Sequence, residues 1–161
     1  MNRKIKVAAG IAVATVLGFA ATSQGASPHF ASVKASVAGN GDLVINVRAA
    51  GLGSNSTVTL QAEGYAEATW GCINRGGKNP GAENKRTEGE GFDQSGVFTS
   101  GRNGSVKAAL VVEMPEMPND LSCPGNMTTE LLSVTYSNLV VTEDVNGLTA
   151  NPNDVSRSFY P

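Results

Sequence analysis

The segment VKASVAGNGDLVINVRA, residues 33–49, decides the fold class of this chain. Its apolar residues recur at every second position on both sides of a central Gly39-Asn40-Gly41 sequence. A period of two places these side chains on one face of a β-strand, and Asn-Gly is a strong hairpin-turn signal. The segment therefore predicts a β-hairpin with one buried face.

The same alternation extends towards the C-terminus, and no segment spaces its apolar residues as a helix would. Further strands are expected within residues 58–72, 97–99, 106–112 and 132–141, and in a final segment ending at Phe159-Tyr160. About seven strands at this spacing predict an all-β fold, an immunoglobulin-like β-sandwich with one disulfide. A small β-barrel is the alternative, because it would show the same alternation.

Two details of the strand pattern concern the chain's turns. The sequence Gly101-Arg-Asn-Gly104 predicts a second hairpin turn between the strands on either side of it. The apolar face changes parity between Tyr136 and Leu139, which predicts a bulge or bend within that strand.

Cys72 and Cys123 are the two cysteines of the chain. An even pair in an oxidising compartment most simply forms one disulfide, which should stabilise the fold by about 4 kcal/mol. Because Trp70 lies two residues before Cys72, we expect its ring to pack against the disulfide in the core. The cysteines have no CxxC spacing, so neither a redox pair nor a zinc site is expected.

The N-terminal segment, residues 1–26, reads as a secretory signal peptide. Arg3, Lys4 and Lys6 precede an uncharged apolar run over residues 7–21, and small residues follow. We therefore expect a secreted, extracellular protein whose mature chain, residues 27–161, forms one domain. No second apolar stretch approaches the ~20 residues that a spanning helix needs, so a membrane-spanning role is not expected.

Removal of that segment would leave 9 Lys and Arg against 14 Asp and Glu, a net charge of −5. This balance argues against a nucleic-acid partner, which would require a basic face.

Catalytic chemistry has little support in the sequence. The single histidine, His29, lies near the mature N-terminus, where it is poorly placed to anchor a catalytic triad or a metal site. Two carboxylate pairs, Glu88 with Glu90 and Glu113 with Glu116, have the composition of a glycosidase acid and base, but their loop context favours surface charges. The chain is therefore expected not to be an enzyme and to hold no cofactor or metal.

Asp144-Val-Asn-Gly147 resembles the start of a calcium loop but lacks the later ligands, so we interpret it as a hairpin turn.

Two polar segments are the candidate binding loops. The first, residues 74–91, is tethered at Cys72, and the second, residues 114–126, contains three prolines and Cys123. The disulfide would hold both loops at one end of the sandwich. The residues nominated for binding are Arg75, Lys78, Asn79, Asn84, Lys85, Arg86, Met117 and Leu121.

A carbohydrate-binding module is an alternative, because Tyr65, Phe92 or Trp70 would stack on a sugar ring if exposed. Eight aromatic residues remain in the mature chain and several must fill the core, which makes a flat sugar platform hard to assemble.

The stretches CINRGGKNPGAENK (72–85), SCPG (122–125) and NGDL (40–43) resemble a group of small secreted proteins of actinobacteria and some fungi. The likeness covers the mature chain and implies secretion, a single disulfide and a β fold, with no catalytic residues. In general architecture the chain is also similar to the adaptor subunits of secreted actinobacterial toxin particles.

The sequence thus favours a secreted, non-enzymatic adaptor that binds another macromolecule, most simply a protein, through loops 74–91 and 114–126. A cell-wall polysaccharide is the alternative partner, and an enzyme of unfamiliar type is the rival class.

Overall fold

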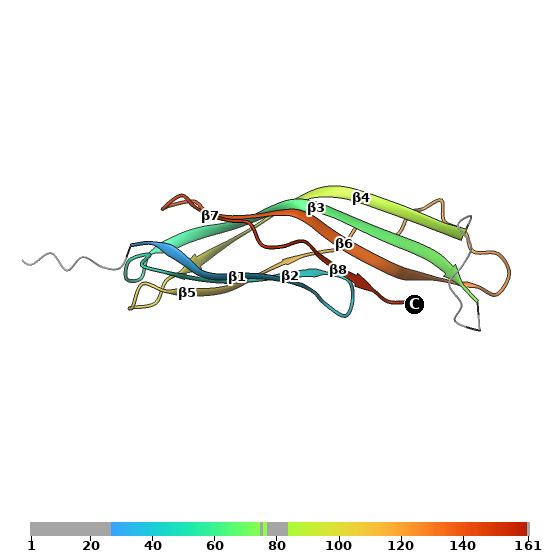
Figure 1. The fold of residues 1–161 in the computed structure, drawn as a ribbon, viewed down its shortest axis with the longest axis horizontal. Coiled ribbons are helices and arrows are strands. Elements are labelled where there is room, and N and C mark those ends of the chain that lie inside the picture. The colour runs from blue at the N-terminus through green and yellow to red at the C-terminus, as the bar shows by residue number, and fades with distance from the viewer. Residues whose placement is uncertain (1–26, 75, 77–83, 161) are drawn as a thin grey trace, which may run out of the picture.

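A computed structural model describes residues 27–74, 76 and 84–160 of the 161-residue chain. This part of the chain folds into two packed β-sheets without a helix (Figure 1). Accordingly, none of the described segments forms a helix long and apolar enough to cross a membrane. The expected signal peptide, residues 1–26, lies outside the described residues.

The first sheet has three antiparallel strands, and its central strand belongs to the hairpin predicted from residues 33–49. The strand order is β1 (His29–Val37), β2 (Leu43–Ala50) and β5 (Val106–Val112). Val37 pairs with Leu43 across the turn, so the predicted hairpin is confirmed.

The second sheet has five strands. They run in the order β4 (Lys85–Thr99), β3 (Thr57–Ile73), β6 (Thr128–Glu143) and β7 (Leu148–Ala150), and β8 (Val155–Ser158) also pairs with β6. The two orders correspond to strands A-B-E and C′-C-F-G of an immunoglobulin-like sandwich, with β7 and β8 together in place of strand G. The predicted all-β sandwich is therefore confirmed, with eight strands because its last segment is divided.

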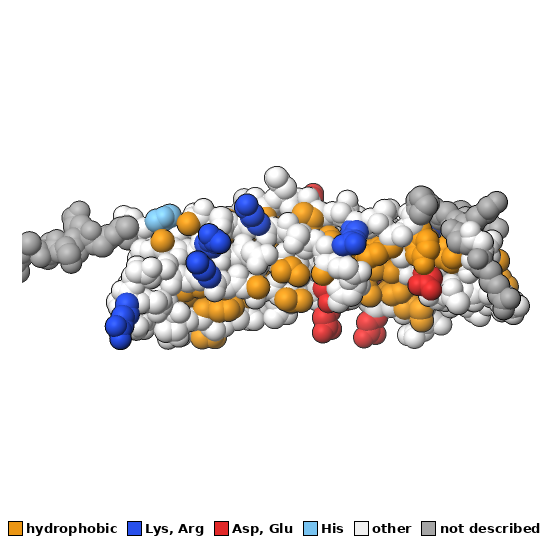
Figure 2. Space-filling view, turned by 90° about the horizontal axis from the view of Figure 1, so that it is seen from below, with side chains coloured by type: hydrophobic (Ala, Val, Ile, Leu, Met, Phe, Trp, Pro, Cys, Tyr) orange, Lys and Arg blue, Asp and Glu red, His pale blue; other side chains and the backbone are white. Residues whose placement is uncertain are grey.

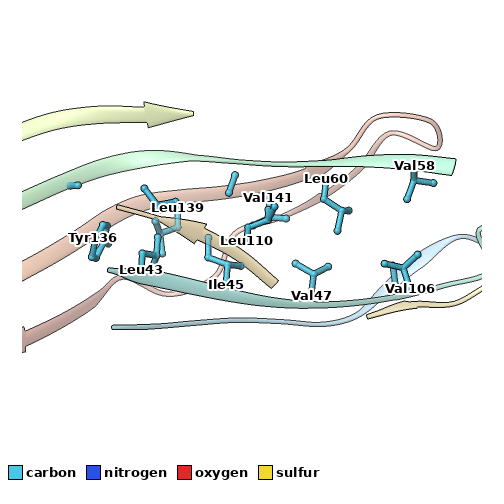
Figure 3. Close-up of a cluster of buried hydrophobic side chains, with 14 of the residues drawn as sticks. Leu43, Ile45, Val47, Val58, Leu60, Val106, Leu110, Tyr136, Leu139 and Val141 are labelled. Atoms are coloured by element: carbon cyan, nitrogen blue, oxygen red, sulfur yellow. The ribbon is translucent and has the colours of Figure 1, made fainter. Parts of the chain in front are cut away.

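The core fills the space between the two sheets (Figure 3). The alternating residues of β2 point inward and meet those of β3, β5 and β6, as period-two patterning requires. The labelled side chains in this cluster are Leu43, Ile45, Val47, Val58, Leu60, Val106, Leu110, Tyr136, Leu139 and Val141, all 5% exposed or less.

A bulge in β6 restores the apolar face where the pattern changes parity. The register against β3 shifts between Glu63 and Tyr65, and Asn138 has a left-handed φ of 54°. The Asn138 amide donates to Asp154 Oδ1 at 3.0 Å. The extra residue returns Leu139 to the core, which confirms the predicted bulge.

The predicted second hairpin is wrong. A tight turn does form, since the Gly101 amide donates to the Ser105 carbonyl at 2.9 Å. The strands on either side nevertheless join different sheets, β4 in the second and β5 in the first. The turn sequence specifies a reversal of the chain, but which sheet each strand joins depends on tertiary packing.

The interpretation of residues 85–91 as loop is also wrong, because they form the first half of β4. They pair in register with β3 from Gly71↔Lys85 to Tyr65↔Gly91. Gly and Glu have low β propensity, but pairing along a neighbouring strand overrides that preference.

Strands β3, β4 and β6 extend well beyond the three-stranded sheet (Figure 1). β3 has 17 residues, whereas β2 has 8. The Tyr136 hydroxyl donates to the Gly41 carbonyl at 2.9 Å, where the β1–β2 turn meets the second sheet. We call residues 67–73, 85–89 and 128–135 beyond this point the overhang, and the remaining two-sheet part the sandwich half.

Candidate functional site

The connection between β5 and β6, residues 113–127, packs against the inner face of the overhang and has no regular secondary structure. The Met114 side chain packs against the core, and its backbone amide donates to Asp42 Oδ1 at 3.2 Å. Pro115 and Pro118 are buried. Proline fixes φ, so these contacts hold a stiff segment in place. The second candidate loop is therefore present as predicted.

The predicted disulfide joins this segment to the sheet. Cys72 lies near the end of β3 and is 1% exposed, and its Cα atom is 5.4 Å from that of Cys123. In antibody domains the disulfide crosses the core between the sheets. Here it instead fastens the 113–127 segment to the overhang.

Trp70 is partly buried and packs against the core cluster, whereas the expected contact of its ring with the disulfide stays a prediction. With Asp42 and residues 113–117 it lines a hollow of about 460 Å³. Its Nε1 atom is buried and has no hydrogen-bond partner among the described residues.

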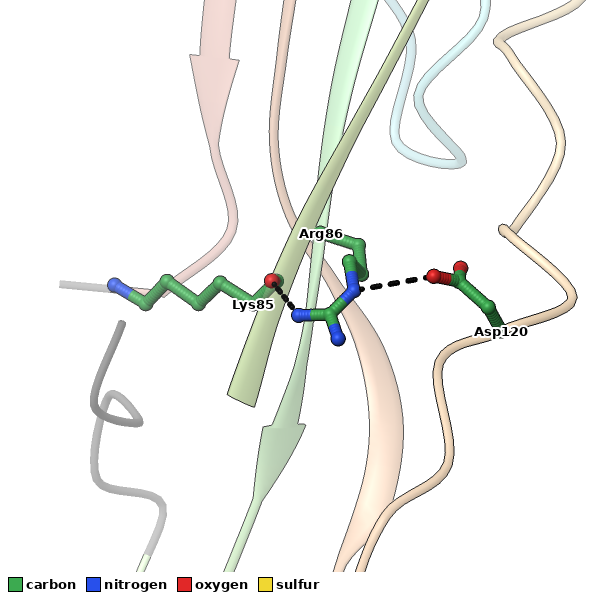
Figure 4. Close-up of polar contacts among 3 residues, drawn as sticks. All are labelled: Lys85, Arg86 and Asp120. Carbon is green, nitrogen blue, oxygen red and sulfur yellow. Dashed lines mark hydrogen bonds and ion pairs between the residues drawn. The ribbon is translucent and has the colours of Figure 1, made fainter. Parts of the chain in front are cut away.

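An ion pair makes a second connection across the site (Figure 4). Arg86 Nε lies 3.4 Å from Asp120 Oδ2, and Arg86 Nη1 donates to the Lys85 carbonyl at 2.8 Å. The Lys85 ammonium points away from this pair. The Arg86 and Asp120 side chains are 43% and 71% exposed, so the pair orients the segment more than it stabilises the fold.

Between β4 and the 113–127 segment lies an open groove of about 660 Å³. One wall comes from Glu88, Gly89 and Glu90 of β4, and the other from residues 113–120. Glu90 and Glu88 pair with the buried residues Ala66 and Ala68 of β3, so their side chains project from the same, inner face of the sheet.

The groove combines negative charge with apolar surface. Its carboxylates are Glu88, Glu90, Glu113, Glu116 and Asp120, and its apolar side chains are Met114, Pro115, Met117 and Pro118. Met117 is 46% exposed. This chemistry fits a ligand that carries positive charges beside apolar groups.

The residues nominated for binding are only partly brought together. Arg75, Lys78 and Asn79 lie outside the described residues. Asn84 directly precedes β4, and Lys85 and Arg86 begin that strand. Met117 lines the groove, whereas Leu121 is partly buried beyond it.

The four glutamates of the groove were recognised in the sequence only as two separate carboxylate pairs. Glu88 and Glu90 alternate with glycines, a period-two signal that indicates a strand with both carboxylates on one face. No local signal places them opposite Glu113 and Glu116, because that proximity depends on the path of the 113–127 segment.

The aromatic residues considered for sugar stacking do not share a surface. Tyr65 is 42% exposed on the outer face of the second sheet, where a side chain at Gly89 would collide with its hydroxyl. Phe92 packs edge-on against Tyr136, with ring centroids 6.1 Å apart. Trp70 also packs against the core. These three rings therefore form no flat platform.

The Asp144–Gly147 segment is the turn between β6 and β7, as predicted. Glu143, 1% exposed, accepts hydrogen bonds from the backbone amides of Val145 and Asn146, both at 3.0 Å. The Thr59 amide donates to Asp144 at 2.8 Å, and this hydrogen bond lowers the pKa of Asp144. Within the described part of the chain, no three His, Cys, Asp or Glu residues are grouped to hold a metal ion.

Tyr136 on β6, whose hydroxyl meets the β1–β2 turn, has the most strongly shifted pKa among the described residues. Burial raises the pKa of Tyr136 to about 12, the charge of Asp42 adds to the rise, and a backbone hydrogen bond with Leu43 partly offsets it. Tyr136 therefore stays neutral at physiological pH and acts as a structural hydrogen-bond donor to Gly41.

No protein-family model matches this chain, and a search of curated proteins found no match.

Proposed function

We propose that this chain is a secreted, non-enzymatic adaptor that binds a cationic, partly apolar segment of a partner protein in the groove between β4 and residues 113–120. The observation that carries the proposal is the composition of this groove: five carboxylates beside two methionines and two prolines.

Charge supports a basic ligand. Glu88, Glu90, Glu113 and Glu116 are all exposed, so they keep their solvation in the free protein and attract cations from a distance. Arg86 is paired with Asp120, which reduces the net charge at one end of the groove while leaving these four glutamates to face a ligand.

Size and surface support a segment rather than a small molecule. A volume of about 660 Å³ is within the range of ligand sites, but the groove lies open beside an edge strand. Methionine adapts its shape to different apolar partners, and Met117 supplies such a surface at 46% exposure.

The groove walls are largely pre-organised. The disulfide at Cys123, the Arg86–Asp120 pair and the Asp42–Met114 hydrogen bond fix the 113–127 segment at three separate points. A wall that is ordered before binding loses less entropy when the partner arrives.

The binding end remains the disulfide end, and Met117, nominated from the sequence, remains a contact residue. Carboxylates take the place of the nominated cations, because Arg86 already contacts Asp120 within the chain. Replacing Arg86 would therefore act on the position of the 113–127 segment as well as on any direct contact.

The test is titration with a fluorescent peptide of alternating Lys and Leu, with an alternating Glu and Leu peptide as comparator. Glu88→Gln combined with Glu90→Gln should weaken Lys-Leu binding at least tenfold, because two groove charges are removed. Glu63→Gln combined with Glu67→Gln is the matched control, since both residues lie on the same sheet but point to its outer face. Equal losses in the two double variants, or equal binding of the two peptides, would contradict the proposal.

A carboxylate-dependent hydrolase is the second candidate, because two carboxylate pairs that lie far apart in sequence line one groove. Their exposure disfavours it, since a glycosidase acid is usually desolvated. Hydrolysis of a polysaccharide panel, abolished by a single Glu88→Gln or Glu113→Gln substitution, would support this candidate over the adaptor.

A further inference from the structure

The three-stranded sheet has an outer face without negative charge. Its strands β1, β2 and β5 contain no Asp or Glu, although acidic residues outnumber basic ones in the mature sequence. Lys34, Arg48 and Lys107 are exposed on this face. Figure 2 looks onto this side of the molecule and shows most of the Lys and Arg side chains in one half and most of the acidic side chains in the other.

The sheet register brings these three cations together. Arg48 on β2 is directly opposite Lys107 on β5. Lys34 on β1 is opposite Asn46 on β2. Because Asn46 lies two residues before Arg48, Lys34 is the diagonal neighbour of Arg48. Opposite residues have Cβ atoms about 5 Å apart and diagonal ones about 7–8 Å, so the three charges form a continuous row across the sheet.

Within the described part of the chain, no carboxylate forms an ion pair with Lys34, Arg48 or Lys107. Like charges directly opposite one another destabilise a sheet, and a carboxylate at either position would remove that cost. The Arg48–Lys107 pair thus lowers the stability of the sheet, and residues that lower stability in this way are concentrated at functional sites.

The surface around the cations is open and combines polar groups with small apolar side chains. The three cations line a hollow of about 870 Å³ together with Ser32, Asn46 and Ala109. The hydroxyl and amide groups offer further hydrogen-bond donors for anionic oxygens. No aromatic side chain lines this hollow, so it lacks the stacking surface with which proteins bind nucleic-acid bases.

We propose that this cationic row is a docking site for a linear, base-free phosphate polymer. A row of charges matches a chain of repeated anionic groups, whereas a protein partner usually anchors a large aromatic or Arg side chain in an enclosed pocket, and this hollow is open. The site is on the outer face of the first sheet and shares no residue with the carboxylate groove. It therefore gives the protein a second binding surface that stands independently of the first.

The test is fluorescence titration of labelled long-chain inorganic polyphosphate with the mature protein. Three phosphate contacts predict that log Kd rises with log salt with a slope of about 2–3. Lys107→Glu should weaken binding at least tenfold and raise Tm by about 2 °C or more, because it converts a repulsive cross-strand pair into an attractive one. Loss of binding in a more stable protein cannot be attributed to misfolding.

Lys85→Glu is the matched control, because it makes the same charge change at the start of β4, outside the hollow. Its polyphosphate affinity should stay within about twofold of wild type. Equal losses in Lys107→Glu and Lys85→Glu would overturn the site, as would binding that is insensitive to salt. Single-stranded DNA of matched charge that binds more than tenfold tighter than polyphosphate would overturn the assignment to a base-free polymer.

Discussion

The sandwich half and the overhang share β3, β4 and β6 but are stabilised by different means. In the sandwich half, apolar side chains from two sheets meet in one cluster that includes Ile45 and Leu60. In the overhang the inner face of one sheet meets an irregular segment, and Cys72, Ile73 and Leu132 are buried outside that cluster. In the sandwich half, burial of apolar area between the two sheets stabilises the fold. In the overhang, the irregular 113–127 segment is held to the sheet by a disulfide and by polar contacts.

The largest difference between the two regions should appear when the disulfide is removed. Cys72→Ser combined with Cys123→Ser should lower the free energy of unfolding by about 4 kcal/mol, because a closed loop of about 50 residues is released in the unfolded chain. Urea denaturation measures this loss. Hydrogen exchange in β2, which occurs by global unfolding, should become faster by the factor that this loss sets, and residues 67–73 and 128–135 should in addition open locally.

Reduced wild-type protein is the control for the serine side chains and should match the double variant. Uniform acceleration of exchange across both regions would contradict a separate role for the disulfide in the overhang.

Truncation of a buried apolar side chain should destabilise the sandwich half more than the overhang. Leu60→Ala, at a side chain with 0% exposure, should cost about 3 kcal/mol, because it leaves a cavity between two sheets. Leu131→Ala in the overhang should cost clearly less, because this side chain is only partly buried. Equal shifts of the urea midpoint would show that the two regions are packed equally well.

High pH should destabilise the protein at the boundary of the two regions, where the Tyr136 hydroxyl titrates. The folded pKa of Tyr136 is raised to about 12 from 10.0, so its stabilising effect is complete below pH 10 and is lost as pH rises towards 12. A shift of this size amounts to up to about 3 kcal/mol at the alkaline limit. Urea denaturation between pH 9 and 12 measures the loss.

Tyr136→Phe should be less stable at neutral pH, because the buried Gly41 carbonyl loses its donor. It should also lose most of the alkaline dependence, and an unchanged pH profile in this variant would assign that dependence to other groups.

The smallest effect on stability should come from the ion pair across the groove. Arg86→Gln should change the free energy of unfolding by less than about 1 kcal/mol, because both partners are substantially exposed. Its consequence should be local, with faster amide exchange around Asp120. A loss as large as that of Leu60→Ala would mean that the pair also stabilises the sandwich half.

Sequence patterns predicted the elements whose signals are local. The hairpin at residues 33–49 has both a period of two and an Asn-Gly turn, and the bulge at Asn138 follows from the parity of β6. The disulfide followed from an even cysteine count in a chain with an expected export signal.

The groove could not be predicted from local sequence patterns, because it depends on which strands and segments lie side by side in the fold. Residues 85–91 read as loop because Gly and Glu are poor strand formers, yet they pair with β3. The turn at Gly101 indicated a hairpin, but its flanking strands belong to different sheets. The partner of a strand is set by which apolar faces can be buried together, and that is decided by the whole chain.

By itself, the sequence determined an all-β chain with alternating strands and a paired set of cysteines, because periodicity and cysteine chemistry are properties of neighbouring residues. Only the tertiary structure decided that Glu88 and Glu90 face the same groove as Glu113 and Glu116, and that Lys34, Arg48 and Lys107 form one row. Surface charges bury no apolar area, so the sequence around each charge does not determine which other charges lie next to it in the fold. Their arrangement follows from strand register and sheet order, which the burial of the core imposes.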